Sequence, residues 1–285
     1  MTQRIQASVR PGDTTRPVVS ICIPHYQVKD LMTVCLRAIR RYTTSPHYEV
    51  IVVDNGSQDE SLEWLKSVPW IRLVQRGTTT PDNWIHAMAT ALDIGLEHAR
   101  GTYYLIMHSD TVVKHHHWLG RLVDAINSGP DIGSAGTGKL ETRTPVYQFF
   151  RSATDTKRLK LWTRRTFLGD QAARQLRREP CARDFCALYR TGVLRDHGLS
   201  FVQKGGYTAG ETVHYDLKKL GFKPHLVPVR EMMTYIDHIA HATGAILPER
   251  KLNHARMFRK TKRRLSALFD RKDIELLLAD TALDR

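Results

Sequence analysis

The sequence predicts an α/β fold in which helices flank a doubly wound, mostly parallel sheet. Between residues 18 and 110, β-branched apolar runs alternate with amphipathic segments. Such runs are typical of strands buried on both faces of a parallel sheet, and the alternation is typical of strand–helix–strand units. Three of the runs also end in polar residues, at the edge where α/β sheets bind ligands. A helical, basic extension is expected at the carboxyl end.

The alternation begins with the β-branched run Val18–Pro24, which the proline ends. A helix is expected over 29–42, because apolar residues recur there on one helical face. The apolar run at 48–53 predicts a second strand. Residues 59–67 then predict a helix, since polar residues that favour a helix start precede them.

The same reasoning extends along the chain. Residues 70–75 and 102–107 predict strands, because they are short runs rich in β-branched and aromatic residues. The longer segment between them, 82–99, carries apolar residues at helical spacing. Further on, 213–220 predicts a helix that Gly221 ends, and a strand is expected over 226–229.

Composition excludes several classes of protein. The 285 residues are 41% hydrophobic and 25% charged, as in a globular protein rather than a disordered or fibrous one. No uncharged apolar run approaches the roughly 18 residues of a membrane-spanning helix. The first residues contain no apolar segment, and the four cysteines form no CxxC pair. We therefore expect a cytoplasmic protein with reduced thiols.

The formal net charge is +14, which favours an anionic partner. A dinucleotide is not expected, because the first strand is followed by Pro24-His25-Tyr26-Gln27 and not by a glycine-rich turn. Nucleic acid is not expected either, because the chain carries no helix-turn-helix, zinc-finger or aromatic RNA-binding signal. Charge alone leaves phosphate-bearing small molecules and anionic lipid open.

Several motifs together carry a family resemblance. They are Val19-Ser20-Ile21-Cys22-Ile23-Pro24-His25-Tyr26, Val50-Ile51-Val52-Val53-Asp54-Asn55-Gly56-Ser57, Gly95-Leu96-Glu97-His98-Ala99-Arg100-Gly101-Thr102-Tyr103-Tyr104-Leu105, and Ala209-Gly210-Glu211-Thr212-Val213. In this order and spacing the chain resembles glycosyltransferase family 2 over about residues 18–245. The resemblance implies a GT-A-type fold and an inverting transfer of sugar from a nucleotide-diphosphate donor to an acceptor hydroxyl.

Composition, helical periodicity and the extent of the resemblance together indicate how the chain is divided. Residues 1–16 would be a flexible arm and 17–248 the glycosyltransferase domain. Within that domain, 17–140 would bind the nucleotide sugar and 141–248 would bind the acceptor and carry out catalysis. Residues 249–285 would form a basic amphipathic tail.

The same resemblance assigns donor-binding residues. Pro24, His25 and Tyr26 would form the pocket for the base, and Asp54 would accept a hydrogen bond from the base or ribose. An Asx-turn at Asp54-Asn55-Gly56 is a simpler explanation that is compatible with this role. Asp93 stands where the family often has an asparagine near the diphosphate.

A divalent cation, Mn²⁺ or Mg²⁺, is expected to stabilise the charge of the leaving diphosphate. The resemblance makes Asp110 its ligand, with His108 and Ser109 beside the donor. His108 stands where the family often has an acid, so either it is a nitrogen ligand that favours Mn²⁺ or Asp110 acts alone. His238 or His241 would supply a further ligand, with His241 slightly preferred. A simple turn residue is the alternative for Asp110.

The general base is expected at Glu211, the first acidic place of the family's Glu-Asp pair. Thr212 occupies the second place, which leaves Asp216 as the reserve. The simpler explanation is that Glu211 begins a helix, where an acid favours the helix dipole. The triplet His115-His116-His117 is expected to be solvated surface.

The family resemblance implies UDP-, GDP- or dTDP-sugars as donors and a glycan or lipid-linked acceptor, as in polysaccharide, glycolipid or other glycoconjugate synthesis. Two basic segments suit an anionic partner. Residues 151–190 hold 11 Lys/Arg against four Asp/Glu. In the tail, Met257, Phe258, Leu265, Leu268 and Phe269 interleave with cations, as in a helix lying on anionic lipid at the inner face of the membrane.

Two other functions stay open. A catalytically inactive nucleotide-sugar-binding module is favoured by the substituted positions His108 and Thr212. A basic nucleic-acid-binding protein is the weaker alternative.

Overall fold

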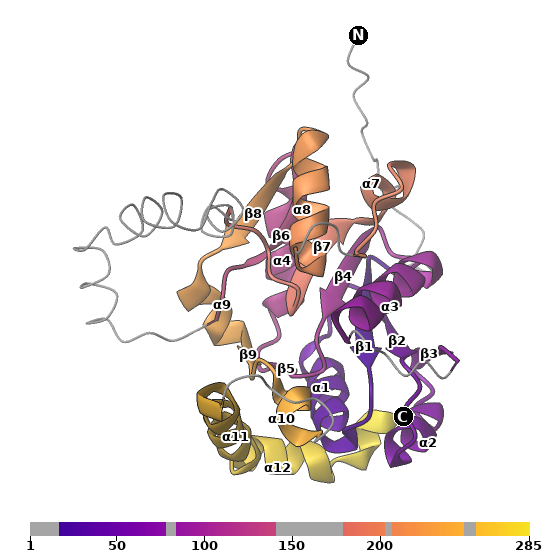
Figure 1. Ribbon diagram of the computed structural model, residues 1–285, viewed down its shortest axis with the longest axis vertical. Coiled ribbons are helices and arrows are strands. Elements are labelled where there is room, and N and C mark those ends of the chain that lie inside the picture. The colour runs from indigo at the N-terminus through magenta and orange to yellow at the C-terminus, as the bar shows by residue number, and fades with distance from the viewer. Residues whose placement is uncertain (1–16, 78–83, 141–178, 203–206, 248–254) are drawn as a thin grey trace, which may run out of the picture.

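A seven-stranded sheet, in the order β3-β2-β1-β4-β7-β6-β8, forms the centre of the molecule (Figure 1). The computed structural model describes residues 17–77, 84–140, 179–202, 207–247 and 255–285. The strands of this sheet are β1 (Val19–His25), β2 (Tyr48–Asp54), β3 (Ile71–Gln75), β4 (Tyr103–Met107), β6 (Ile132–Thr137), β7 (Cys186–Arg190) and β8 (Lys223–Val227). A separate two-stranded sheet pairs β5 (Thr111–Val113) with β9 (Ile236–His238).

The described helices surround this sheet. They are α1 (Lys29–Tyr42), α2 (Glu60–Lys66), α3 (Trp84–His98), α4 (Trp118–Asn127), α7 (Thr191–Asp196), α8 (Ala209–Lys219), α9 (Val229–Tyr235), α10 (Ala242–Ile246), α11 (Ala255–Phe269), α12 (Lys272–Ala279) and the 3-10 turn Thr281–Asp284. None of these helices has the length and hydrophobicity to cross a membrane.

The predicted α/β class is confirmed, and the sheet is mostly parallel. β1 pairs in parallel with both β2 and β4, and β2 pairs in parallel with β3. β7 is the exception, because it runs antiparallel to both β4 and β6. The register places His25 beside Asp54, so the carboxyl ends of β1 and β2 reach the same edge of the sheet.

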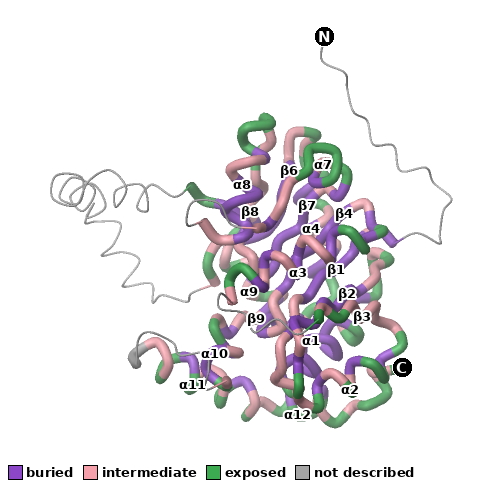
Figure 2. Tube along the Cα trace, turned by 45° about the vertical axis from the view of Figure 1, so that its right-hand side comes forward, coloured by how far each residue is buried: buried purple, intermediate pink, exposed green. Residues whose placement is uncertain are grey.

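Alternation along the strands divides the core between the two faces of the sheet. Ile21 and Ile23 of β1 pack with α1 and α4, whereas Cys22 packs with α3 and α8. All three side chains are fully buried. Figure 2 shows the central strands β1, β4 and β7 as almost continuously buried, as expected when helices cover both faces.

Two predicted boundaries are wrong. The strand expected at 226–229 is β8, which begins at Lys223 and ends at Val227. β8 is the last strand of the sheet, where Pro224 costs no internal ladder hydrogen bond. Pro228 begins α9 instead of continuing the strand. The helix expected from 213 begins earlier, at Ala209, because Thr208 caps it.

The tail folds back onto the domain as two helices. α12 lies against α1, and α11 lies against α10 (Figure 1). Leu268 is only 2% exposed, and Leu265 and Phe269 pack against the same core. Most of the apolar stripe expected to lie on lipid therefore contacts protein, and the outward side of α11 is basic. The basic stretch 151–178 lies outside the described residues.

Candidate functional site

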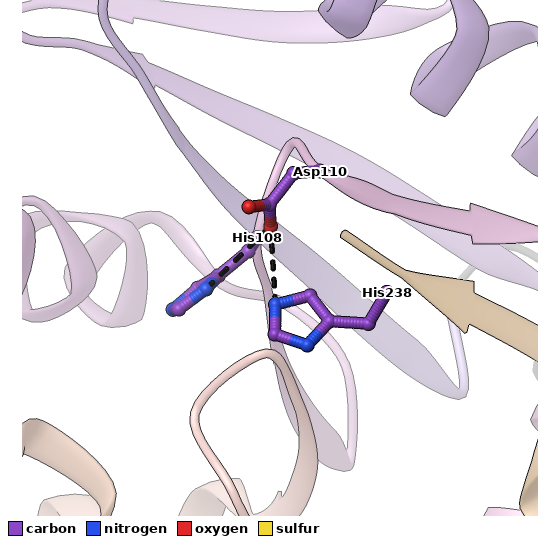
Figure 3. Close-up of side chains that lie close together, drawn as sticks. All are labelled: His108, Asp110 and His238. Carbon is purple, nitrogen blue, oxygen red and sulfur yellow. Dashed lines mark ion pairs between the residues drawn. The ribbon is translucent and has the colours of Figure 1, made fainter. Parts of the chain in front are cut away.

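Three potential metal ligands meet just beyond the carboxyl end of β4. His108 and Asp110 lie in the turn that joins β4 to β5, and His238 ends β9. The antiparallel pairing of β5 with β9 sets Thr111 opposite His238, which brings the histidine to the turn. His238 Nε2 lies 3.3 Å from Asp110 Oδ1, and His108 Nδ1 lies 3.8 Å from the same oxygen (Figure 3).

The charge state of this cluster suits metal binding. Burial would raise the pKa of Asp110, but the His238 and His108 rings and the Ala242 backbone N–H hold it well below its usual range. That N–H donates to Asp110 Oδ2 at 3.2 Å. Burial lowers the pKa of His108. At neutral pH the cluster therefore offers a carboxylate and a neutral imidazole, the forms that ligate metals.

The residues present fit a divalent cation. Each of the three side chains has one buried atom without a hydrogen-bond partner in the described structure: His108 Nε2, Asp110 Oδ1 and His238 Nε2. One ligand atom from each residue lies within 4.8 Å of the others. Unpartnered buried polar atoms are costly, and a shared cation would satisfy them. Two imidazoles with one carboxylate suit a first-row transition metal better than Mg²⁺, which prefers oxygen.

The structure brings His238, and not His241, into the cluster. The Phe185 ring stacks on His238 with centroids 4.2 Å apart, which fixes the orientation of the imidazole. Ala240 and His241 have positive φ angles of 38° and 67°, and the chain there turns to leave His241 exposed at the start of α10. Sequence spacing could not separate the two histidines, because this turn was not predicted.

The end of β2 confirms the Asx-turn interpretation of Asp54. Its Oδ2 accepts the backbone N–H groups of Gly56 at 3.1 Å and Ser57 at 3.0 Å, and its Oδ1 accepts the Ser57 hydroxyl. The Asp54 side chain is buried. Its first role in this structure is to shape the loop after β2.

His25 is only 1% exposed, and its Nε2 lies 2.8 Å from the Ser61 hydroxyl of α2. Burial lowers its pKa to about 4. The ring therefore packs between β1 and α2 as a neutral group. Pro24 and Tyr26 are half-buried, and the Tyr26 ring lies 4.7 Å from Trp84 at the start of α3. These two aromatic rings provide a stacking surface at the sheet edge.

Asp93 does not join the Asp110 cluster. Both of its carboxylate oxygens are engaged, accepting the Ser200 hydroxyl at 2.5 Å and the Phe201 N–H at 2.7 Å. Asp93 lies nine residues after Trp84 on α3, so it is about 14 Å along the helix axis from the aromatic surface at the sheet edge. Asp93 thus anchors the segment after α7 to α3. Ser109 is half-buried in the turn between the two cluster residues.

Glu211 is 2% exposed and participates in a capping box at the start of α8. Its Oε2 accepts the Thr208 N–H at 3.0 Å, and its Oε1 lies 3.3 Å from Arg183 Nη1. The helix-start interpretation of Glu211 is therefore confirmed. Asp216 lies further along α8, where Lys219 donates to it at 2.7 Å.

Asp184 is a site candidate that the sequence analysis missed. Its Oδ1 accepts the Gly210 N–H at 3.0 Å and the Thr208 hydroxyl at 3.4 Å. Burial raises its pKa, while the electrostatic effect of His108 opposes that rise. Asp184 precedes β7, and an antiparallel strand brings its amino end to the edge where parallel strands have their carboxyl ends. Recognising β7 would have revealed it.

Comparison with known proteins shows what this chain is similar to. The family model described as "Glycosyl transferase family 2" matches residues 20–198. Glycosyltransferase AglE of Haloferax volcanii is 31% identical over 140 residues, which cover 46% of this chain and 42% of that protein. The match thus spans less than half the length of this curated relative.

Solved structures share the fold. The mannosyltransferase PcManGT from Pyrobaculum calidifontis, in complex with GDP-Man and Mn²⁺, superposes with a TM-score of 0.51 and 19% identity, covering 94% of this chain and 80% of that one. Residues 1–349 of S. aureus TarS superpose with a TM-score of 0.50 and 14% identity, covering 92% and 69%. At these identities the likeness is one of fold.

Proposed function

The chain belongs to glycosyl transferase family 2, whose model matches more than half of it, and we propose that it transfers a sugar from a nucleotide-diphosphate donor to an acceptor hydroxyl with inversion. One observation carries this proposal: the His108–Asp110–His238 cluster, two half-buried histidines around a buried carboxylate, at the ligand-binding edge of the sheet. Testing UDP-, GDP- and dTDP-sugars for metal-dependent thermal stabilisation and slow hydrolysis would check it. If no nucleotide sugar raises the melting temperature of the protein, with or without added metal, the proposal is contradicted.

His108, Asp110 and His238 would hold the divalent cation. When bound there, the cation would neutralise charge on the donor diphosphate as the sugar leaves. The imidazole of His108 takes the place of a second carboxylate, so the protein contributes one negative charge to the site. That Mn²⁺ accompanies GDP-Man in the mannosyltransferase of similar fold supports the proposal.

The first prediction concerns metal choice. We expect Mn²⁺ to support donor binding at a concentration at least about tenfold lower than Mg²⁺, because two of the three protein ligands are imidazoles. Titrating each metal against the EDTA-treated protein, with thermal stabilisation by the nucleotide sugar as readout, measures the difference. His108→Asp would place carboxylates at both positions 108 and 110. This variant should reduce the difference between the Mn²⁺ and Mg²⁺ concentrations that donor binding requires. Equal half-saturation by both metals in the wild type would contradict this ligand assignment.

We propose Glu211 as the general base for the acceptor hydroxyl, with Asp184 as the second candidate. Both carboxylates contact the start of α8, where Glu211 completes the capping box and Asp184 accepts the Gly210 N–H. Glu211 is held by Arg183 and Thr208, contacts that position it but also engage both of its oxygens. The raised pKa of Asp184 makes it the stronger proton acceptor once ionised.

The second prediction separates these two carboxylates. Loss of a general base should lower kcat by about 10²–10⁴-fold while leaving donor affinity within about twofold. We expect this of Glu211→Gln, which keeps the cap geometry, and a much smaller effect of Asp216→Asn, whose carboxylate pairs with Lys219 further along α8. If Asp184→Asn gives the large loss and Glu211→Gln does not, the base is Asp184. Donor binding with no turnover in the wild type would favour an inactive binding module.

For the donor, we propose that the nucleotide base stacks at Tyr26 and Trp84, and that Pro24 lines the same pocket. The ring separation of 4.7 Å and the half-buried state of both side chains support this. Asp54 and His25 would not contact the base directly. Their hydrogen bonds to Ser57 and Ser61 would hold the loops that shape the pocket. Ser57 Oγ also accepts the backbone N–H of Gln27, which joins the two loops.

We further propose that the protein acts in the cytoplasm in glycoconjugate synthesis. Four unpaired, buried cysteines are compatible with that compartment. The outward residues of α11 support an electrostatic attraction to the inner face of the membrane; they include Arg259, Lys260, Lys262 and Arg263.

A further inference from the structure

The candidate metal ligand His238 lies on a small element of the fold. In the described part of the chain, the three-residue strand β9 pairs only with the three-residue strand β5. The flanking backbone adds hydrogen bonds from Lys114 N–H to the Tyr235 carbonyl at 2.9 Å and from Ile239 N–H to the Asp110 carbonyl at 3.1 Å. Two short paired strands are only marginally stable by themselves. A fixed position for His238 therefore calls for contacts from outside this small sheet.

Asp237, the residue before His238 in β9, makes such contacts. Its Oδ1 accepts from Lys114 Nζ, just after β5, and its Oδ2 accepts from Arg271 Nη1, each at 2.7 Å. The three side chains are 27–34% exposed, so solvent screens these ion pairs less than it screens fully exposed ones. A single carboxylate thus joins β9 both to β5 and to the C-terminal tail.

Arg271 is itself held in place from two sides. It is the N-cap residue of α12, and its Nε and Nη2 donate to the two oxygens of Asp273 at 3.0 and 2.6 Å, while Nη1 donates to Asp237. α12 is in turn fastened to α1, because Arg37 donates to the Leu277 carbonyl at 3.0 Å. A guanidinium is planar, so these contacts fix the direction in which Nη1 points. The tail therefore presents a rigid donor to Asp237.

We propose that Arg271 is a positioning residue for the metal ligand His238, acting through Asp237, so that the C-terminal tail forms part of the candidate metal site. The inference rests on the proposed function, because it takes the His108–Asp110–His238 cluster as the donor's metal site. Groups that orient a metal ligand change metal affinity although they do not touch the ion.

A pocket of about 300 Å³ beside this network offers a matched control. Its lining includes Asp237, His238 and Arg271, together with Arg264 of α11. Arg264 has the same charge as Arg271 and lines the same pocket, whereas the two oxygens of Asp237 accept from Lys114 and Arg271. Replacing Arg264 therefore removes a nearby charge and leaves the contacts of Asp237 in place.

Electrostatics and positioning predict opposite signs for the effect of Arg271→Gln. Removing a cation near a metal site lowers the repulsion of the metal, so charge alone predicts tighter binding of Mn²⁺. Loss of positioning predicts weaker binding. We expect Arg271→Gln to weaken Mn²⁺ binding about tenfold, at the lower end of the effect of groups that orient metal ligands. Electron paramagnetic resonance of free Mn²⁺, titrated into the full chain without donor, measures the affinity. Arg264→Gln should stay within about twofold of the wild type.

Three further variants test the route through Asp237. Arg271→Lys should keep the affinity within about threefold, because Asp237 accepts only one N–H from Arg271 and an ammonium also supplies a charged donor. Lys114→Gln should weaken Mn²⁺ binding in the same direction as Arg271→Gln, which provides a second test if that variant folds poorly. Adding Arg271→Gln to His238→Gln should cause no further loss. A further loss in that double variant, or unchanged or tighter binding in Arg271→Gln, would overturn the proposal.

Nuclear magnetic resonance of the metal-free protein tests the positioning directly. With isotope-labelled histidines, the His238 signals are those missing from His238→Gln, and stacking on the Phe185 ring should shift them in the wild type. We expect Arg271→Gln to move them toward the values of an exposed histidine, and Arg264→Gln to leave them in place. Unchanged His238 signals in Arg271→Gln would overturn the proposal. A wild type that binds no Mn²⁺ would contradict the metal site of the proposed function, whereas this measurement without metal would still decide whether Arg271 positions His238.

Discussion

Replacing Asp110 by Asn is expected to reduce metal-dependent sugar transfer by at least about 100-fold, the usual cost of removing one charged stabilising group from an active site. Asp110 supplies the cluster's carboxylate, and both histidines approach its Oδ1. Asparagine keeps the shape of the side chain but removes its negative charge. The measurement is initial rate against Mn²⁺ concentration, with electron paramagnetic resonance to count bound Mn²⁺.

A matched control exists for this variant. Asp131→Asn removes a carboxylate that pairs with Lys223 at 2.7 Å on the surface, and it should leave rate and metal binding unchanged. Because Asp110 is buried, thermal unfolding of the metal-free protein must accompany the rates. His238→Gln offers a second route, since it should weaken Mn²⁺ binding while leaving Asp110 in place. Full metal-stimulated activity in both cluster variants would show that the metal binds elsewhere.

Replacing Arg37 by Ala is expected to lower the free energy of unfolding by about 3–5 kcal/mol, the cost of breaking a buried ion pair. Arg37 is 4% exposed on α1, and it holds the end of the chain. It donates to the backbone carbonyls of Leu277 and Leu278 and to both oxygens of Asp284. Burial would raise the pKa of Asp284, but the hydrogen bonds from Arg37 and Trp64 lower it.

Urea unfolding monitored by circular dichroism measures the Arg37 effect. Arg40→Ala is the matched control on the same helix, because Arg40 is exposed, donates to the carbonyl of Arg285 and lies over the Trp70 ring, and forms no ion pair with a carboxylate in the described part of the chain. Its cost should stay below about 1 kcal/mol. An Arg37→Ala variant within 1 kcal/mol of the wild type would show that α12 is held by apolar packing alone.

The metal site was only partly predictable. Asp110 follows a strongly apolar strand, so its position at the sheet edge could be inferred from the local pattern. His238 comes from a three-residue strand that has no periodicity to detect. Its choice over His241 depended on the pairing of β9 with β5, a contact between segments more than 100 residues apart. Long-range pairing of short strands leaves no local signature.

The sequence by itself determined the alternation of strands and helices up to residue 110 and the polar groups at three strand ends, because burial on both faces of a parallel sheet requires continuous apolar runs. It also carried the net charge of +14. The tertiary structure alone decided what the candidate side chains contact. Asp54 shapes the loop after β2, Asp93 accepts hydrogen bonds from Ser200 and Phe201, and Glu211 caps α8. The antiparallel strand β7 brings Asp184 to the same edge of the sheet.

The tertiary structure also decided the use of the basic tail. Helical periodicity predicts an amphipathic helix but not the partner of its apolar side. In the folded chain that side of α11 largely packs against the domain, where Leu268 is buried and Leu265 and Phe269 contact the same core. Only folding could place Arg264 in the same pocket as His238, since the residues that line this pocket come from three separate parts of the sequence.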